Sequence, residues 1–160
     1  MPKRRGKPIP AYSFIRDGKK VDQFFFQLSL IDVFERCVID YRLGLSCTAA
    51  DACKDLKNNL RKRDISKGIA LPKLRMDNGL QFVARQFQQL YDQLGVIHER
   101  VPGRTPNMNA HIESFHSILE EEYYSRYEFQ NSMEAYAIVT EYMDYYNKRR
   151  KHGSLRYMTP

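Results

Sequence analysis

Two carboxylates, Asp77 and Glu113, stand in separate local motifs with 35 residues between them. Asp77 lies in the segment RMDNGLQF, where apolar residues flank it and an Asn-Gly turn follows. Glu113 follows a loop rich in Pro and Gly and falls in the second turn of a predicted helix. Carboxylates from different elements can together hold a divalent metal ion for phosphoryl transfer. The simpler alternative is a turn-forming Asp and a solvated helical Glu.

The elements that must position these residues follow from the hydrophobic pattern, which predicts an α/β chain. A short strand leads into Asp77, and Ile112, Phe115 and Leu119 form the apolar stripe of the helix that carries Glu113. The first three predicted strands are joined by short turns and should form an antiparallel meander. The predicted strands are Tyr12–Arg16, Gln23–Ile31, Cys37–Leu43, Lys73–Met76 and Val96–Val101. The predicted helices are Thr48–Arg63, Val83–Leu94, Asn107–Tyr123 and Asn131–Arg150.

Charge is concentrated at the two ends of the chain. The formal net charge is +7, and residues 1–20 carry seven Lys or Arg against Asp17 alone. Residues 147–160 carry five Lys or Arg and no acidic residue. Basic ends of this kind fit contact with a phosphate backbone, although solvated tails would have the same composition. No apolar run approaches a membrane-spanning length, and three cysteines without metal-ligand spacing indicate reduced thiols.

Four further stretches stand out, in the order FFFQLSLIDVF, DNGLQF, NAHIESF and YNKRRKHGSL along the chain. They resemble bacterial insertion-sequence transposases and retroviral-type integrases, whose catalytic core uses an Asp, Asp, Glu triad with 35 residues between the last two. The resemblance covers about Gln23 to Pro160. It implies an RNase H-like domain over 12–160, preceded by a basic unstructured arm at 1–11. The expected mixed five-stranded sheet joins the meander, with a truncated first strand, to two short parallel strands, and helices flank it.

The resemblance also implies a function, namely DNA transposition or integration by phosphoryl transfer on DNA ends with Mg²⁺ or Mn²⁺. Asp77 and Glu113 would be the catalytic and metal-binding residues. DNA would be the main partner, with a full-length transposase or a second copy as a further one, and no membrane. Work on DNA implies a bacterial cytoplasmic protein, nucleoid-associated when bound. The candidate DNA-binding residues are Arg104, Asn109, Lys148, Arg149, Arg150 and Lys151.

The first carboxylate of the triad has no counterpart in the sequence. Its expected position, in a Trp-x-x-Asp-like strand, falls near Ile9, where the segment KPIP holds neither Trp nor an acid. Asp17 and Asp22 flank a hairpin and read as turn residues, and Asp32 reads as a turn or capping acid. We therefore expect a truncated, frameshifted or degraded reading frame that is inactive by itself. The alternative function is a non-catalytic fragment that binds DNA or a full-length transposase, so enzymatic activity stays open.

The helix that carries Glu113 departs from the family at a second position. Many relatives have Lys or Arg seven residues after the Glu, where it can reach DNA, whereas this chain has Glu120 in an acidic run. His116 lies on the same helix and is interpreted as a surface residue. The tyrosine pairs at 123–124 and 145–146 are interpreted as packing residues.

Overall fold

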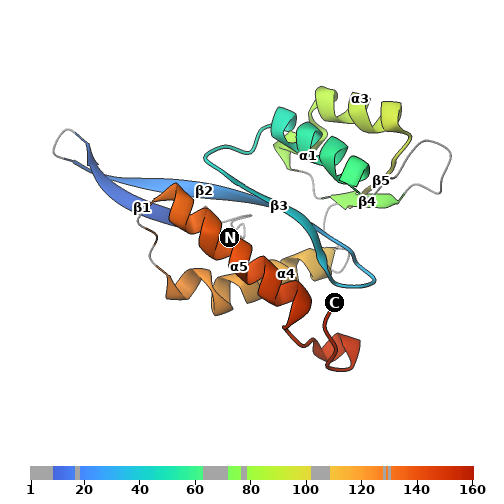
Figure 1. Ribbon diagram of the computed structural model, residues 1–160. Coiled ribbons are helices and arrows are strands. Elements are labelled where there is room, and N and C mark those ends of the chain that lie inside the picture. The colour runs from blue at the N-terminus through green and yellow to red at the C-terminus, as the bar shows by residue number, and fades with distance from the viewer. Residues whose placement is uncertain are drawn as a thin grey trace, which may run out of the picture. The chain divides into compact units, whose positions relative to one another are not determined.

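The computed structural model describes residues 9–16, 19–62, 72–76, 79–101, 109–127, 129 and 131–160, with side chains from residue 25 onward except that of Arg100. The chain divides into two compact units. One consists of Met1–Ser46 together with Phe115–Pro160, and the other of Cys47–Ser114 (Figure 1). Each unit is described below by itself.

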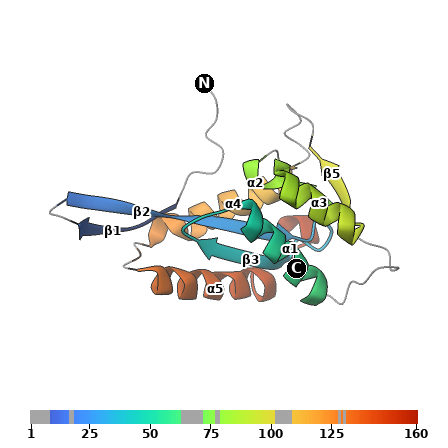
Figure 2. The same cartoon turned by 90° about the horizontal axis from the view of Figure 1, so that it is seen from above.

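The first unit is built on a three-stranded antiparallel sheet in the order β1-β2-β3 (Figures 1 and 2), which confirms the predicted meander. Its strands are β1 (Ile9–Arg16), β2 (Lys19–Ile31) and β3 (Val38–Gly44). β1 begins earlier than the predicted Tyr12, because Ile9 pairs with Phe25 and Pro10 with Phe24. The register shifts between Pro10 and Tyr12, and such an irregularity tolerates a residue that has no N–H. Residues 9–11, which were predicted to belong to the unstructured arm, are therefore part of β1. Residues 1–8 lie outside the described part of the chain.

The turn between β2 and β3 is closed by Asp32. Its Oδ1 accepts hydrogen bonds from the backbone N–H groups of Phe34 (2.8 Å) and Glu35 (3.0 Å). Arg36 then adopts a left-handed conformation with φ 64° and donates its N–H to the Asp32 carbonyl. These bonds confirm the prediction that Asp32 is a turn-forming acid.

Helix α5 (Ser132–Lys148) lies alongside the sheet and contacts β3 (Figures 1 and 2). Its N-cap is Asn131, whose side chain accepts a hydrogen bond from the Glu134 N–H. Near its other end, the Asn147 amide bonds both backbone groups of Val38, at 2.8 Å each. The helix is therefore fixed to the first residue of β3. Its inner face buries Ala135, Val139, Tyr142, Met143 and Tyr146.

Helix α4 (Ala110–Glu122) begins in the second unit and ends in the first. Within the first unit it buries Phe115 and Leu119, and the Phe115 ring meets Tyr146 edge-on at 5.1 Å. A 3-10 turn (Tyr124–Arg126) follows the helix, and Tyr123 donates its hydroxyl hydrogen to the Ile138 carbonyl at 2.5 Å. Helices α4 and α5 are thus held together by aromatic side chains. Tyr123 and Tyr146 are buried, which confirms that they are packing residues.

Besides the start of α4, the described residues of the second unit form two parallel strands and three helices. These elements are α1 (Ala49–Lys62), β4 (Lys73–Met76), α2 (Leu80–Val83), α3 (Arg85–Leu94) and β5 (Ile97–Arg100). Helix α1 starts with reciprocal bonds: the Asp51 N–H donates to the Thr48 hydroxyl, and the Asp51 carboxylate accepts from the Thr48 N–H. Thr48, the first residue of the predicted helix, therefore caps the N-terminus of α1.

The predicted helix at Val83–Leu94 is observed from Arg85 as α3, and the short helix α2 before it was not predicted. Ala84 separates the two helices, because it is extended, with φ −61° and ψ 138°. The predicted end at Leu94 is confirmed, and Gly95, which follows it, is left-handed with φ 71°. Glycine suits this position because it has no Cβ to oppose a positive φ.

The described strands form a three-stranded sheet and a separate two-stranded sheet. The parallel pair of β4 and β5 is as predicted. The joining of both sheets into a single five-stranded sheet is not confirmed and stays a prediction. Among the described residues, no helix has the length and apolar character needed to span a membrane.

Candidate active site

Strand β4 leads directly into the position of Asp77. It pairs in parallel with β5, from Lys73 opposite Ile97 to Met76 opposite Arg100. Met76 is buried, whereas Arg75 forms an exposed ion pair with Glu99 on the neighbouring strand at 2.9 Å. The strand that carries the first candidate carboxylate is therefore present at its predicted bounds. Asp77 and Asn78 themselves lie outside the described residues.

Glu113 lies in the first turn of α4, one turn earlier than predicted, because the helix begins at Ala110. Its side chain is exposed, while Ile112 is half-buried and Phe115 is buried. The packed neighbours fix the helix orientation and leave the Glu113 carboxylate facing solvent. Asn109 is half-buried immediately before the helix, and Arg104 lies outside the described residues. The approach of Glu113 to Asp77 stays a prediction.

The lack of the first carboxylate of the expected triad stays a prediction. The sequence of β1, IPAYSFIR, contains no acid. Asp22 pairs with Ser13 in the β1–β2 hairpin, Asp17 lies outside the described residues, and Asp32 closes the next turn. Within the described part of the chain, no group of three or more His, Cys, Asp or Glu side chains could hold a metal ion.

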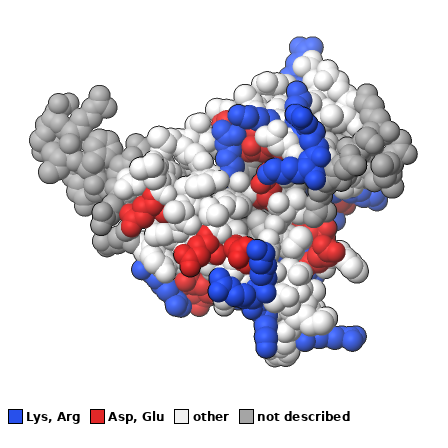
Figure 3. All heavy atoms as spheres, in the orientation of Figure 1, with Lys and Arg blue, Asp and Glu red and all other residues white. Residues whose placement is uncertain are grey.

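The basic cluster at the end of α5 divides into residues with different partners. Lys148 forms an exposed ion pair with Asp144 at 2.5 Å, and the Arg149 guanidinium lies 5.7 Å from the Tyr145 ring centroid. Lys151 is exposed. Figure 3 shows basic side chains gathering over the C-terminal segment at the lower edge of the molecule, next to acidic ones. Lys148, Arg149 and Lys151 are therefore accessible to a ligand.

Arg150 forms an ion pair with Glu122 inside the first unit. Its Nη2 lies 2.6 Å from Glu122 Oε1 and its Nε lies 3.0 Å from Glu122 Oε2, which is a two-pronged pairing. Tyr142 donates its hydroxyl hydrogen to the same carboxylate at 2.9 Å. The hydrogen bonds from Arg150 lower the pKa of Glu122, and burial raises the pKa of Tyr142. The Arg150 side chain is 19% exposed, so it is a poor candidate for phosphate contact.

His152 completes this cluster. It is buried, its ring meets Tyr146 at 4.7 Å, and its Nδ1 lies 3.3 Å from Arg150 Nη1. Burial and the nearby Arg150 charge lower the pKa of His152. Sequence reasoning did not predict the link between Glu122 and Arg150. The sequence shows only an acidic run at 120–122 and a basic YNKRRKHGSL stretch. No local spacing connects the two, so the ion pair could not be predicted.

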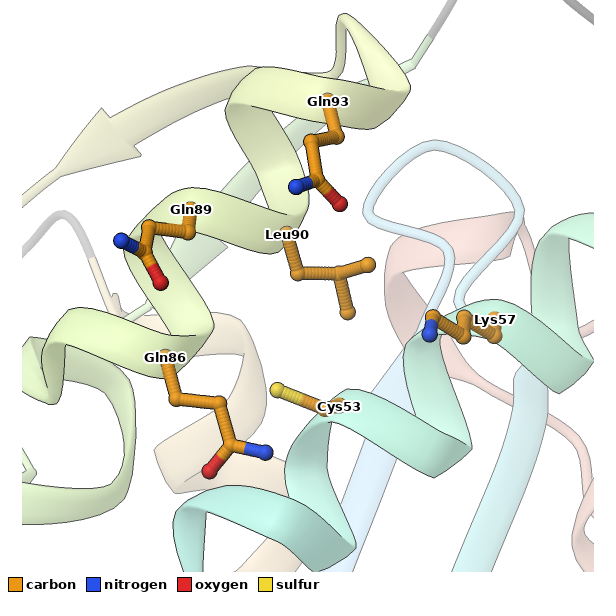
Figure 4. Close-up of a pocket in the computed structure, with 6 residues that line it drawn as sticks. All are labelled: Cys53, Lys57, Gln86, Gln89, Leu90 and Gln93. Atoms are coloured by element: carbon orange, nitrogen blue, oxygen red, sulfur yellow. The ribbon is translucent and has the colours of Figure 1, made fainter.

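A separate pocket of about 180 Å³ lies between α1 and α3 in the second unit (Figure 4). Three amide side chains of α3 line one wall, and Cys53 and Lys57 of α1 line the other. Burial raises the pKa of the Cys53 thiol, so the thiolate that would act as a nucleophile is disfavoured. The pocket was not predicted from the sequence. Its lining residues are Cys53, Lys57, Gln86, Gln89, Leu90 and Gln93.

Comparison with known proteins places this arrangement in one family. An integrase core domain family model matches residues 94–160. The transposase InsK assigned to insertion sequence element IS150 of Escherichia coli (strain K12) is 35% identical over 149 residues, 92% of this chain and 50% of that protein. The chain spans about half the length of the curated relatives that it matches.

Solved structures show the same fold at low sequence identity. The catalytic core domain of BIV integrase has a TM-score of 0.60 and 17% identity, covering 81% of this chain and 79% of that one. The Mos1 transposase catalytic domain, solved with Raltegravir and Mg, has a TM-score of 0.59 and 19% identity, covering 81% and 65%. The fold is RNase H-like. The chain belongs to the catalytic-core family of insertion-sequence transposases and integrases.

Proposed function

We propose that this domain uses Asp77 and Glu113 to hold a divalent metal ion for phosphoryl transfer on DNA ends. The observation that carries the proposal is the placement of Glu113, an exposed carboxylate on the first turn of α4 beside packed Ile112 and Phe115. Asp77 follows the last residue of β4, so the paired strand would hold its backbone. A strand end and a helix would thus supply one carboxylate each.

The donor set suits Mg²⁺ or Mn²⁺, because both ions prefer carboxylate oxygen and retain several waters. Such an ion, when bound, would activate the attacking oxygen and stabilise the leaving one. The protein's own part is to orient the two carboxylates and to bind the DNA backbone nearby. Arg104 and Asn109, in the segment before α4, are the proposed backbone contacts at the site.

A Mn²⁺ titration followed by the EPR signal of the free ion tests the carboxylates. Glu113→Gln and Asp77→Asn should each remove most of the detectable binding, because each replacement loses a charged ligand. Glu120→Gln is the matched control, since Glu120 is also exposed and lies on the same helix. It should bind Mn²⁺ as the parent chain does. Equal binding by all four proteins would contradict the proposed site.

We also propose that the chain performs no strand transfer by itself. The lack of an acid in β1 supports this, since a two-metal site needs a ligand that both ions share. The second candidate function follows from the same observation: a non-catalytic domain that binds DNA, a full-length transposase or a second copy of this chain. A strand-transfer gel with labelled transposon ends separates the two functions, and gel filtration with and without DNA reports self-association.

A further inference from the structure

The chain after α5 forms a compact loop that we call the C-terminal knuckle, residues 152–158. It contains a 3-10 turn (Gly153–Leu155) and a bridge between His152 and Met158. Two consecutive non-glycine residues, Arg156 (φ 55°) and Tyr157 (φ 63°), are left-handed. This conformation is uncommon outside glycine and persists only where the surroundings impose it.

Backbone hydrogen bonds impose the conformation here. The Tyr157 N–H donates to the His152 carbonyl at 2.9 Å, and the His152 N–H donates to the Met158 carbonyl at 3.0 Å. Two further bonds run from Arg156 to Gly153 and from Met158 to Leu155. His152 is itself buried against Tyr146, so the knuckle is anchored to the first unit. The loop is therefore preorganised.

The side chains that this backbone holds point into solvent. Tyr157 is 75% exposed and Met158 is 62% exposed, although both are large and partly apolar. By contrast, Tyr142 and Tyr146 of α5 are buried. Burial of Tyr157 therefore does not account for the strained backbone. A rigid aromatic ring kept in solvent is a surface on which a flat ligand can stack.

The charge around the ring selects the ligand. Residues 147–160 contain five Lys or Arg and no acid. Lys151 and Arg156 are exposed and, among the described residues, neither forms an ion pair. Arg149, which stacks on Tyr145, adds a third cation that is not neutralised by a carboxylate. An exposed aromatic ring within a basic segment of the chain matches a base attached to phosphates.

We infer that the C-terminal knuckle binds single-stranded DNA, with an unpaired base stacked on Tyr157 and neighbouring phosphates paired with Lys151 and Arg156. Proteins that bind single strands combine aromatic stacking with a basic surface in this way. The inference rests on the proposed function, because that function makes DNA the ligand. It adds that the protein also contacts an unpaired strand of that DNA. Neither Asp77 nor Glu113 takes part.

Fluorescence anisotropy with a labelled oligothymidylate of about 20 nucleotides tests the inference on the full chain. Tyr157→Ala should weaken binding at least about fivefold, because stacking contributes about 1–3 kcal/mol per base. Tyr157→Phe keeps the ring and should bind within twofold of the parent. Tyr136→Ala removes another exposed tyrosine, near the opposite end of α5, and should leave the affinity unchanged.

Three further ligands show whether the base is what Tyr157 contacts. An abasic strand of equal length keeps the phosphates, so the parent and Tyr157→Ala should bind it equally. Both proteins should also bind duplex DNA alike. The inference would be overturned if Tyr157→Ala weakened binding equally to all three DNAs, or did not weaken binding to the single strand. It would also be overturned if the parent bound RNA of matching sequence more tightly than the DNA strand. Duplex binding by the parent tests the proposed function separately, since it does not depend on Tyr157.

Discussion

Arg150 shows at the scale of one residue how the structure changes an interpretation drawn from sequence. In the run of four basic residues it looked like its neighbours, yet its guanidinium is held by the Glu122 carboxylate. A half-buried ion pair of this kind is poor evidence of net stabilisation, but removing one partner leaves the other unpaired. Arg150 is therefore expected to matter for folding more than for DNA binding.

The matched pair Arg150→Met and Arg149→Met tests this expectation. Arg150→Met should lower the free energy of unfolding by about 1–3 kcal/mol, because the Glu122 carboxylate loses its charged partner and keeps only the Tyr142 hydroxyl as a donor. Arg149→Met should change it by less than about 0.5 kcal/mol, as exposed substitutions usually do. Urea denaturation followed by circular dichroism measures both. Equal losses would contradict the distinction between the two arginines.

His152 should make stability depend on pH. Its pKa is lowered from 6.5 by burial and by the nearby Arg150 charge, so the unfolded chain takes up a proton first. The contribution of neutral His152 to the free energy of unfolding is therefore complete above about pH 6.5. It is lost as the pH falls toward the lowered pKa that His152 has in the folded protein. Glu122 belongs to the same cluster, and its pKa is lowered from 4.5. The stability that ionised Glu122 contributes is therefore lost only below pH 4.5. The two groups thus act in different pH ranges.

The measurement is the urea midpoint between pH 5 and 7.5. The parent should lose stability as the pH falls below about 6.5. His152→Gln should flatten this dependence, whereas His116→Gln, at an exposed position on α4, should retain it. A parent whose midpoint does not change over this range would rule out the assigned role of His152.

At the scale of elements, Asn147 connects α5 to the start of β3. Asn147→Ala should destabilise the first unit by about 1–3 kcal/mol, because both backbone groups of Val38 lose a partner. The Val38 amide should also exchange its hydrogen faster. Asn58→Ala in α1 makes the same helical replacement at a half-buried site and serves as the control. Unchanged exchange at Val38 would contradict this connection.

The elements that sequence predicted well carry their own local signals. Gly95 marked a helix end because only glycine readily adopts its positive φ, and Asn131 began α5 as an N-cap. The break at Ala84 had no signal, since alanine favours helix and no Gly or Pro is present. The pairing of Pro10 was also missed, because the irregularity that accommodates it depends on β2.

The candidate site shows the same division. The apolar stripe through Phe115 and the β4 pattern predicted which elements carry Glu113 and Asp77. Periodicity could not show that Glu122 and Arg150 meet, because they are 28 positions apart in the sequence and the contact depends on how α4 packs against α5. Nor could it show the left-handed pair at 156–157, which backbone hydrogen bonds between His152 and residues 157–158 maintain.

At the scale of the whole molecule, the excess of basic residues predicts salt-dependent DNA binding. Affinity for duplex DNA should fall steeply with salt, because each neutralised phosphate releases condensed counterions. Lys148→Ala combined with Lys151→Ala should reduce the salt slope by about one unit per lost contact. Glu120→Gln should not reduce it, since it removes a negative charge. A salt-independent affinity would contradict phosphate binding.

The last prediction concerns the missing carboxylate and its repair. The unmodified chain should give no strand transfer with Mg²⁺, because β1 offers no acid to a shared metal site and such catalytic groups act as a unit. Replacing Ile9–Arg16 with a Trp-x-x-Asp-bearing strand from a full-length relative should strengthen Mn²⁺ binding and restore some product. The same replacement with Asn in place of the Asp keeps the strand and should restore neither. Robust activity of the unmodified chain would show that Asp17, Asp22 or Asp32 supplies the first carboxylate, and those three would then be mutated in turn.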